Sequence, residues 1–412
     1  MAGSLDGIRV VDLSRVLAGP YCAQMLADHG ADVVKVESPG GDDTRRWGPP
    51  FVDDETSAYY RNLNRDKRNI VVDLRTEEGR DVVERLLATA DVVVQNFKHG
   101  TFERWGWTEE VLQQRYPALV HCRITGFGTD GPLGGLPGYD AVLQAYSGLM
   151  SVNGEPNGDA LRVGVPIVDL VTGTLAFSGI VLALHERTRS GRGQQVDVNL
   201  LSTALSLLHP HSGAWLADGT VGRRLGSAHS SIAPYENYPT RDGLIFIGTG
   251  NDQQFALLAA ALDLVWLTED PRFGSNSDRL RNAAELRALL RPPIAQHDRE
   301  SLARDLLARG VPAAPVYDIA EALTAPQARH NGMLVDRGDG YRGIGIPIAL
   351  SHSPGTVGPG PQRAGADTRA ILAELGYDAE QIESVISRGG VRAAAPTGDP
   401  NTEPVTASDE PG

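Results

Sequence analysis

The sequence predicts an α/β fold built on a parallel sheet, and three observations support this. Short apolar runs at 9–13, 32–37 and 91–95 have the composition of buried strands. Segments with helical spacing of about a dozen residues, such as 76–89, separate them, which is the pattern of right-handed βαβ units. The length of 412 residues exceeds what one hydrophobic core usually holds. We therefore expect a Rossmann-like parallel-sheet large domain and a smaller α+β domain.

The elements expected in the large domain alternate in order along the chain. Strands are expected at 9–13, 32–37, 69–74, 91–95, 119–125 and 195–200. Helices are expected at 19–29, 76–89, 108–114, 140–149 and 170–189, followed by one long helix at 201–217. A G-x-G-x-x-G pattern at 126–131 is followed by Pro132 and Pro137, which prevent the helix that a dinucleotide site requires. We interpret 126–137 as a loop.

The pattern of expected elements changes near residue 226, where short helices replace the long ones. A strand at 243–248 and helices at 253–262, 279–290 and 299–309 define the smaller domain. A strand at 345–350 and helices at 367–375 and 379–388 return to the large domain. The predicted boundaries are therefore 1–225 and 326–390 for the large domain and 226–325 for the small one. Residues 391–412 are rich in Pro, Thr, Ala and acidic residues and are expected to be a disordered tail.

Composition excludes several kinds of partner. A formal net charge of −14 argues against nucleic acid or an anionic membrane surface. The two cysteines, Cys22 and Cys122, are far apart and lack metal-ligand spacing, so we expect no metal site and a reducing cytoplasm. The start of the chain has no signal-peptide pattern, which also favours the cytoplasm. The most apolar stretch, 163–184, contains Asp169, so we interpret it as a buried core helix and not as a membrane span.

Asp169 is the most informative ionisable residue. It has apolar neighbours on both sides and directly precedes a helical pattern. On these residues alone, a helix N-cap is the more common role. The two roles are compatible, because a carboxylate at a helix N-terminus stays ionised, and an ionised, partly desolvated carboxylate can act as a nucleophile.

Separated segments of the chain share one family resemblance. They lie at 5–20, 31–37, 41–45, 62–68, 95–97, 138–140, 164–173, 226–235 and 248–254. In these segments the chain resembles the class III (CaiB/BaiF-type) CoA-transferases, and most closely the succinyl-CoA-dependent transferases that act on dicarboxylates such as glutarate. The resemblance extends, in order, to about residue 390. It implies that the chain is a CoA-transferase and that its large domain is built from both ends of the chain.

The resemblance also implies a mechanism and a set of site residues. Asp169 would attack an acyl-CoA, giving a mixed anhydride and then an aspartyl-CoA thioester. A loop with Gly248 and Gly250 would stabilise the oxyanion, although a simple turn after a strand is the alternative. CoA would contact Val16, Leu17, Asn96, Arg104 and Tyr139. CoA and acyl-CoA are substrates, no tightly bound cofactor is implied, and the expected assembly is an interlocked, ring-like homodimer.

Several cations are candidates for binding anionic groups. Arg45, Arg224 (or its neighbour Arg223) and His229 could bind the distal carboxylate of a dicarboxylic acid, since arginine pairs with carboxylates through two hydrogen bonds. The cluster Arg65, Lys67 and Arg68 could meet a CoA phosphate, as could Arg104. The alternatives are ordinary surface charges and, for His229, a hydrogen-bonded core histidine.

Two other functions remain open from the sequence. An α-methylacyl-CoA racemase of the same fold uses a His–Asp pair, but Tyr139 occupies the histidine position, and tyrosine, with a pKa of about 10, is a poor base. A non-catalytic CoA-binding protein is the other alternative. Within the transferases, Pro137 occupies a position where the formyl-CoA/oxalate branch has lysine, so oxalate is an unexpected acceptor.

Overall fold

The computed structural model describes residues 3–395, which form two compact units. Unit 1 comprises residues up to Ser147, Gly164–Leu207 and the chain from His330 onward. Unit 2 comprises Gly148–Val163 and Leu208–Arg329. Segments 148–163 and 208–225, which the sequence analysis assigned to the large domain, thus group with unit 2. The functional division into domains stays a prediction.

A seven-stranded sheet forms the centre of unit 1, in the order β14-β5-β2-β1-β6-β7-β8. All neighbours pair in parallel except β14, which is antiparallel to β5. The strands are β1 (Arg9–Asp12), β2 (Asp32–Glu37), β5 (Arg68–Val72), β6 (Val92–Gln95), β7 (Val120–Thr125), β8 (Gln195–Asn199) and β14 (Val391–Arg392). The strand order reverses between β1 and β6, as in Rossmann-like sheets, so the predicted α/β class is confirmed.

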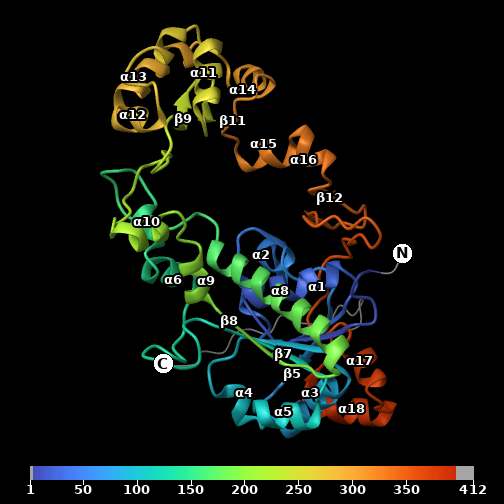
Figure 1. The fold of residues 1–412 in the computed structure, drawn as a ribbon. Coiled ribbons are helices and arrows are strands. Elements are labelled where there is room, and N and C mark those ends of the chain that lie inside the picture. The colour runs from blue at the N-terminus through green and yellow to red at the C-terminus, as the bar shows by residue number, and fades with distance from the viewer. Residues whose placement is uncertain (1–2, 396–412) are drawn as a thin grey trace. The chain divides into compact units, whose positions relative to one another are not determined.

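Helices cover both faces of this sheet (Figure 1). On one face, α3 (Glu77–Thr89), α4 (Thr101–Arg104), α5 (Glu109–Arg115), α17 (Thr368–Glu374) and α18 (Ala379–Ser387) bury a core with the strands. On the other face, α1 (Ala18–Asp28) packs against α8 (Ile167–Ser190). The valine-rich central strands are buried on both sides, as a doubly covered parallel sheet requires.

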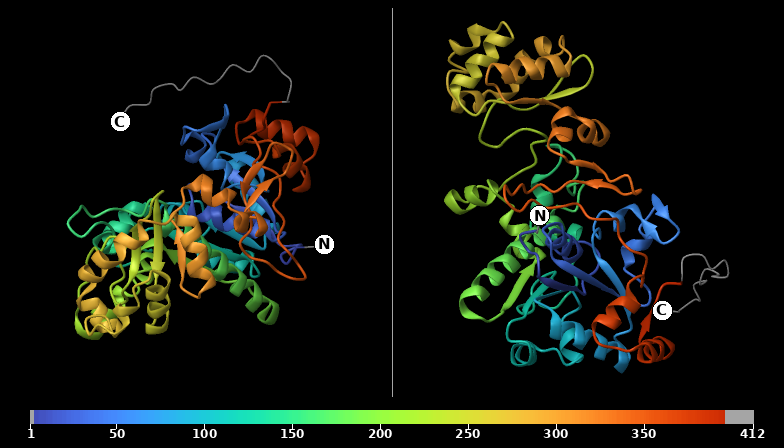
Figure 2. Two further views of the ribbon diagram at one scale, coloured as in Figure 1. Left: turned by 90° about the horizontal axis from the view of Figure 1, so that it is seen from above. Right: turned by 90° about the vertical axis from the view of Figure 1, so that its right-hand side faces the viewer.

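The C-terminal segment returns to the beginning of unit 1, where its helices lie beside the N-terminal strands (Figure 2). The expected disorder from residue 391 is wrong for Val391 and Arg392, because these residues hydrogen-bond to β5 as β14. Residues 396–412 of the expected tail lie outside the described part of the chain. The strand expected at 345–350 does not form. The segment just before it is a hairpin of β12 (Leu334–Asp336) and β13 (Arg342–Ile344).

Unit 2 contains a three-stranded antiparallel sheet in the order β11-β10-β9. Its strands are β9 (Tyr235–Pro239), β10 (Leu244–Gly248) and β11 (Ala313–Pro315), and β9 was not anticipated. The sheet shares an apolar core with α11 (Asp252–Ala261), α13 (Ala283–Ile294) and α14 (Arg299–Ala308). The shorter elements of the chain are β3 (Phe51–Asp53), β4 (Thr56–Ser57), α2 (Ala58–Arg61), α7 (Leu149–Val152), α15 (Ile319–Thr324), α16 (Pro326–His330) and the 3-10 turns η1 (Asp43–Arg46) and η2 (Val265–Thr268).

Two predicted helices are each divided in the structure. The long helix expected at 201–217 is α9 (Leu200–Ser206) and α10 (His211–Asp218), and Pro210 stands at the break. Proline cannot donate a backbone hydrogen bond within a helix, which explains the interruption. The helix expected at 279–290 is α12 (Asn276–Arg281) followed by α13.

Helix α8 is long and apolar enough to cross a membrane by length and composition, with a mean hydropathy of 2.0 over its most apolar window. It packs against α1, α9, β7 and β8 along one face, where Val168, Ala176, Ile180 and Ala183 are buried. Leu182 on another face is 70% exposed. The predicted buried core helix is therefore buried on one side only.

Candidate active site

A pocket of about 380 Å³ opens at the carboxyl ends of the parallel strands of unit 1. Residues that follow β1, β2, β5 and β6 line it, so it lies where the strand order reverses, the usual ligand position in an open α/β sheet. The lining side chains and backbone belong to Leu13–Arg15, Lys35–Asp42, Val72–Arg75, Phe97 and Trp105. Phe97 and Trp105 meet edge to face at the side of the pocket, with ring centroids 5.1 Å apart.

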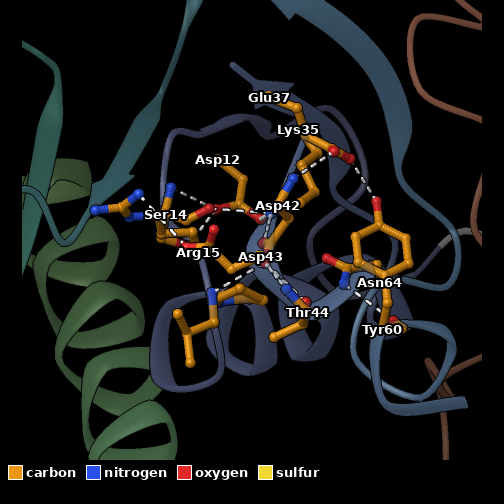
Figure 3. A network of polar contacts seen from close by, with 12 residues as sticks. Asp12, Ser14, Arg15, Lys35, Glu37, Asp42, Asp43, Thr44, Tyr60 and Asn64 are labelled. Atoms are coloured by element: carbon orange, nitrogen blue, oxygen red, sulfur yellow. Dashed lines mark hydrogen bonds and ion pairs between the residues drawn. The ribbon is translucent and has the colours of Figure 1, made fainter. Parts of the chain in front are cut away.

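A network of buried charges underlies this pocket (Figure 3). Lys35 donates to the backbone oxygen of Ser14 at 3.0 Å and lies 3.1 Å from Asp42. Lys67 donates to Asp12 at 2.9 Å, and Asp12 accepts the backbone N–H of Ser14 at 3.0 Å. These buried ions are all hydrogen-bonded, as buried charges must be. Together they fix the loop between β1 and α1.

That loop contains a backbone outlier. Val16 has φ of +73°, a left-handed conformation that a β-branched residue rarely adopts. Its N–H faces Asp42 Oδ1 at 3.4 Å, while Asn96 accepts from the Arg15 N–H at 3.0 Å and donates to the Arg15 oxygen at 2.8 Å. The surrounding contacts thus impose the strained conformation, a pattern that is common at ligand sites. Leu17, the next residue, is buried at the start of α1.

The predicted carboxylate ligand Arg45 is used inside the fold. It is 7% exposed, and its Nε and Nη2 bond both oxygens of Glu37 at 2.8 and 2.7 Å. Nη2 also contacts the hydroxyl of Tyr60. The edge of the guanidinium formed by Nε and Nη2, which a substrate carboxylate would need, is therefore occupied by Glu37.

The basic cluster at 65–68 is likewise engaged with internal carboxylates. Arg65 bonds both oxygens of Asp28, at 2.7 and 2.6 Å. Arg68 bonds Asp32 and Glu374. These cations balance neighbouring charges, and so they offer little net positive field to a phosphate.

Asp169 lies in the first turn of α8, as its third residue. The expected N-cap role is wrong, because the cap position is Pro166 and a different carboxylate, that of Asp140 in α6 (Asp140–Tyr146), accepts the first free N–H groups. Within residues 3–395, no hydrogen-bond donor contacts the side chain of Asp169. The Asp169 carboxylate is thus free for chemistry.

The electrostatic surroundings of Asp169 differ from the expectation. Burial raises the pKa of this carboxyl to about 7, and the negative charge of Asp140 acts in the same direction. From the sequence, the helix terminus was predicted to keep Asp169 ionised. Because Asp140 takes the N–H groups that would have done so, Asp169 gains its ionised form only near neutral pH.

Close packing of two helices places Asp169 near the β1–α1 loop. Gly173, four residues further along α8 and on the same face, approaches α1 so closely that a Cβ there would lie 2.6 Å from the Ala18 oxygen. Tyr59 of α2 is also near, since burial and the charges of Asp169, Asp140 and Asp42 raise the pKa of its phenol to about 12. The ring of Tyr59 packs edge to face on that of Trp47, with ring centroids 5.3 Å apart. Asp169, Tyr59 and the Val16 loop therefore belong to one region of unit 1.

The remaining predicted CoA contacts are on the surface of unit 1. Tyr139 precedes α6 and its side chain is 63% exposed. Arg104, at the end of α4, is exposed and donates to Thr101. Both side chains are accessible to a ligand.

The other predicted site residues lie in unit 2. Gly248 ends β10, and the N–H of Gly250 donates to Gln254 Oε1 at 2.7 Å, so this N–H is engaged in the present conformation. Arg224 is half-buried, whereas Arg223 lines a pocket of about 90 Å³ with His211 and His229. The roles of Gly248, Gly250, Arg224 and His229 stay predictions. Among residues 3–395, no three His, Cys, Asp or Glu side chains are grouped to hold a metal ion.

Comparison with known proteins decides the family. The model of CoA-transferase family III matches residues 5–368. The chain belongs to CoA-transferase family III. It is 41% identical over 381 residues to a succinate–glutarate CoA-transferase of Agrobacterium fabrum, covering 90% of this chain and 95% of that one. It is 37% identical to the human succinyl-CoA:glutarate CoA-transferase, covering 94% and 90% of the two chains.

A solved structure agrees with this assignment. A CaiB/BaiF family protein from Brucella suis superposes with a TM-score of 0.83 at 42% identity, over 91% of this chain and all of that one. The chain is therefore an enzyme that transfers CoA, and the racemase and scaffold alternatives have no support from these relatives.

Several residues of this candidate site were not predicted from the sequence. Arg75, Phe97 and Trp105 line the pocket, and Asp140 and Tyr59 are the titratable neighbours of Asp169. The pocket residues follow predicted strands, so the rule that ligands bind at the carboxyl ends of parallel strands could have found them. Asp140 stands in the family segment 138–140, but its contact with α8 could not be predicted, because that contact is tertiary.

Proposed function

We propose that this CoA-transferase moves CoA from succinyl-CoA to a dicarboxylic acid such as glutarate, with Asp169 as the nucleophile. The carboxylate of Asp169, which no described donor contacts and which ionises near neutral pH, is the observation that supports this most directly. The donor and acceptor are those named for relatives that share 37–41% of their residues with this chain over nearly its full length.

The proposed chemistry is balanced without a cofactor. An Asp169 oxygen attacks the thioester carbonyl of succinyl-CoA, and the C–S bond breaks to give a mixed anhydride and CoA thiolate. The thiolate then attacks the aspartyl carbonyl, forming an aspartyl-CoA thioester and releasing succinate. The incoming carboxylate reverses these two steps and leaves as its own CoA thioester. No net proton is taken up or released.

The pocket at the end of the sheet is our proposed site for the nucleotide end of CoA. Phe97 and Trp105 offer apolar and aromatic surface for an adenine ring, whereas Arg75 is bonded to Asp73 through Nε and Nη2 and would have to exchange that partner to bind a phosphate. Val16, Leu17 and Asn96 form or fix the loop after β1, along which the pantetheine chain would run toward Asp169. Arg104 and Tyr139 are further accessible contacts.

The substrate proposal is tested by acyl exchange. Purified protein is incubated with succinyl-CoA and one acid in each reaction. The acids are glutarate, other dicarboxylates, a matched monocarboxylate and oxalate, and new acyl-CoA species are measured by mass spectrometry. We expect glutaryl-CoA to form, with kcat/KM at least tenfold above the matched monocarboxylate and no oxalyl-CoA. Absence of exchange with every acid would refute the proposal. Incorporation of solvent deuterium at the α-carbon of a branched acyl-CoA would instead establish racemisation.

We also propose that the enzyme is a homodimer with interlocked chains. Leu175 and Leu182, seven residues apart on one face of α8, are 42% and 70% exposed, and Val181 adjoins them. A soluble enzyme rarely leaves such an apolar helix face in water, so a second copy is a suitable cover. Light scattering on a sizing column should give twice the chain mass, and Leu182→Glu should shift the species toward monomer or aggregate. A monomeric native protein would contradict this assembly.

The proposed compartment is a reducing cytoplasm. Cys22 and Cys122 are both free and buried. Free thiols are ordinary in reducing compartments, and the net charge of −14 does not favour nucleic acid or anionic membrane partners.

A further inference from the structure

The start of α8 is capped by a residue from another helix. The second and third residues of a helix have N–H groups without partners in the helix, and the N-cap side chain usually accepts them. In α8 the N-cap residue is Pro166, which has no such side chain. Asp140 Oδ2 accepts both N–H groups instead, from Val168 at 2.8 Å and from Asp169 at 3.1 Å.

Burial and a second hydrogen bond fix the position of the Asp140 carboxylate. It is 8% exposed, and its other oxygen, Oδ1, accepts from Gln144 Nε2 at 2.5 Å. Position 140 is the first residue of α6, so its carboxylate also benefits from the positive end of that helix. No Lys or Arg in the described part of the chain forms an ion pair with Asp140. Its negative charge therefore acts on its surroundings without a compensating cation.

We propose that Asp140 is a positioning residue that occupies the N–H groups at the start of α8 and thereby leaves the Asp169 carboxylate as a reactive nucleophile. This inference rests on the proposed role of Asp169. Without the Asp140 carboxylate, the N–H groups of the first turn of α8 would be available to the side chain of Asp169 itself. A carboxylate that accepts such bonds is stabilised in its ground state, and it loses nucleophilicity.

A second effect of Asp140 is electrostatic. Burial is the main cause of the raised pKa of Asp169, and the negative charge of Asp140 acts in the same direction. Within residues 3–395, Asp140 is the charged group that shifts Asp169, and Tyr59 on α2 is the other titratable group near it. Helix α1 presents the ring of Tyr21 to α8 beside Gly173. Thus one residue occupies the helix N–H groups and adds to the raised pKa that burial gives Asp169.

The test separates these effects with two variants. Asp140→Asn keeps an oxygen that can accept both N–H groups but removes the charge, whereas Asp140→Ala removes both. For native enzyme, kcat/KM for succinyl-CoA at fixed glutarate should rise with pH around 7, as Asp169 of the free enzyme ionises. For Asp140→Asn, the midpoint of this rise should fall by about one unit, with a plateau a few-fold lower. At pH 5.5 the ionised fraction of Asp169 would then be about eightfold larger than in native enzyme.

Asp140→Ala should lower the plateau of kcat/KM further than Asp140→Asn, with the loss in kcat and with KM for glutarate changed less than twofold. Thermal unfolding and binding of CoA report whether each variant is folded. If Asp140→Ala does not fold, the pH profile of Asp140→Asn alone decides. An Asp140→Asn profile that coincides with the native one would overturn the inference while native exchange still stood. Failure of native exchange would refute the proposed function itself.

Discussion

Asp169→Asn is expected to abolish acyl exchange while it stabilises the folded protein above pH 7. An amide cannot form the mixed anhydride, and it cannot carry CoA as a thioester. Loss of a covalent nucleophile lowers kcat by roughly 10⁴-fold or more. The residual rate with succinyl-CoA and glutarate should therefore be below detection in the exchange assay.

The covalent intermediate gives a direct measurement. Native enzyme incubated with succinyl-CoA should gain the mass of CoA less water on the peptide that contains Asp169. The Asn variant should gain nothing, and the matched variant of an exposed aspartate, Asp6→Asn, should behave as native enzyme. A CoA adduct on the Asn variant, or on a different peptide of native enzyme, would contradict the role of Asp169.

The stability change follows from the raised pKa of Asp169. Its pKa is about 7 in the folded protein, against an ordinary value of 3.8. Between these values the folded state binds more protons than the unfolded state, so the contribution of Asp169 to stability falls as pH rises through 4 to about 7. Above pH 7 the buried, ionised Asp169 lowers the free energy of unfolding by its full amount, on the order of 2–4 kcal/mol. Asparagine removes this penalty.

Unfolding in urea at several pH values measures this effect. The gain in unfolding free energy of Asp169→Asn over native enzyme should be close to zero near pH 4 and should grow toward pH 8. Asp6→Asn again serves as the control. A gain that is the same at all pH values would show that the Asp169 carboxyl titrates normally in the folded protein.

Much of the large unit could be predicted from local patterns. Apolar strands such as 32–37 and 91–95 alternate with amphipathic helices, and this periodicity is a property of the sequence itself. The errors occur where tertiary contacts decide the structure. Val391 and Arg392 follow the last helix in a polar context, yet they pair with β5 because this strand has a free edge.

In the candidate site, too, local features could be predicted from the sequence and tertiary contacts could not. Asp169 could be recognised from its apolar surroundings and from the family resemblance. The cap supplied by Asp140 could not, because 28 residues separate Asp140 from Val168 and the contact depends on how α6 meets α8. Arg45 was predicted from its neighbours in sequence to be a candidate ligand for a substrate carboxylate, with a surface charge as the alternative. Glu37, eight residues earlier at the end of β2, is its actual partner.

The ion pair of Arg45 and Glu37 should have the largest effect on stability. Both side chains are buried, and Tyr60 and Asn69 also donate to Glu37, at 2.7 and 2.6 Å. Burial alone would raise the pKa of Glu37, but the hydrogen bonds and charge of Arg45 hold it at about 2. Arg45→Met leaves this carboxylate buried without its main partner, so we expect a loss of about 3–5 kcal/mol in the free energy of unfolding at pH 7.

The pH dependence and a second substitution test the cause. In native enzyme the lowered pKa of Glu37 stabilises the fold above about pH 4.5, and this contribution is lost as pH falls toward 2. In Arg45→Met the pKa of Glu37 should rise, so the variant should be relatively more stable at pH 5 than at pH 8. Adding Glu37→Gln removes the unpaired charge and should restore most of the loss, as a double-mutant cycle would show.

The same cycle distinguishes a structural arginine from a substrate ligand. If Arg45 bound the distal carboxylate of the acceptor, its replacement would raise KM for glutarate and leave KM for a monocarboxylate unchanged. Glu37→Gln would not repair that defect. Because the guanidinium of Arg45 is already bonded to both oxygens of Glu37, we expect the opposite result. Stability should be lost first, and the paired substitution should restore stability together with the remaining activity.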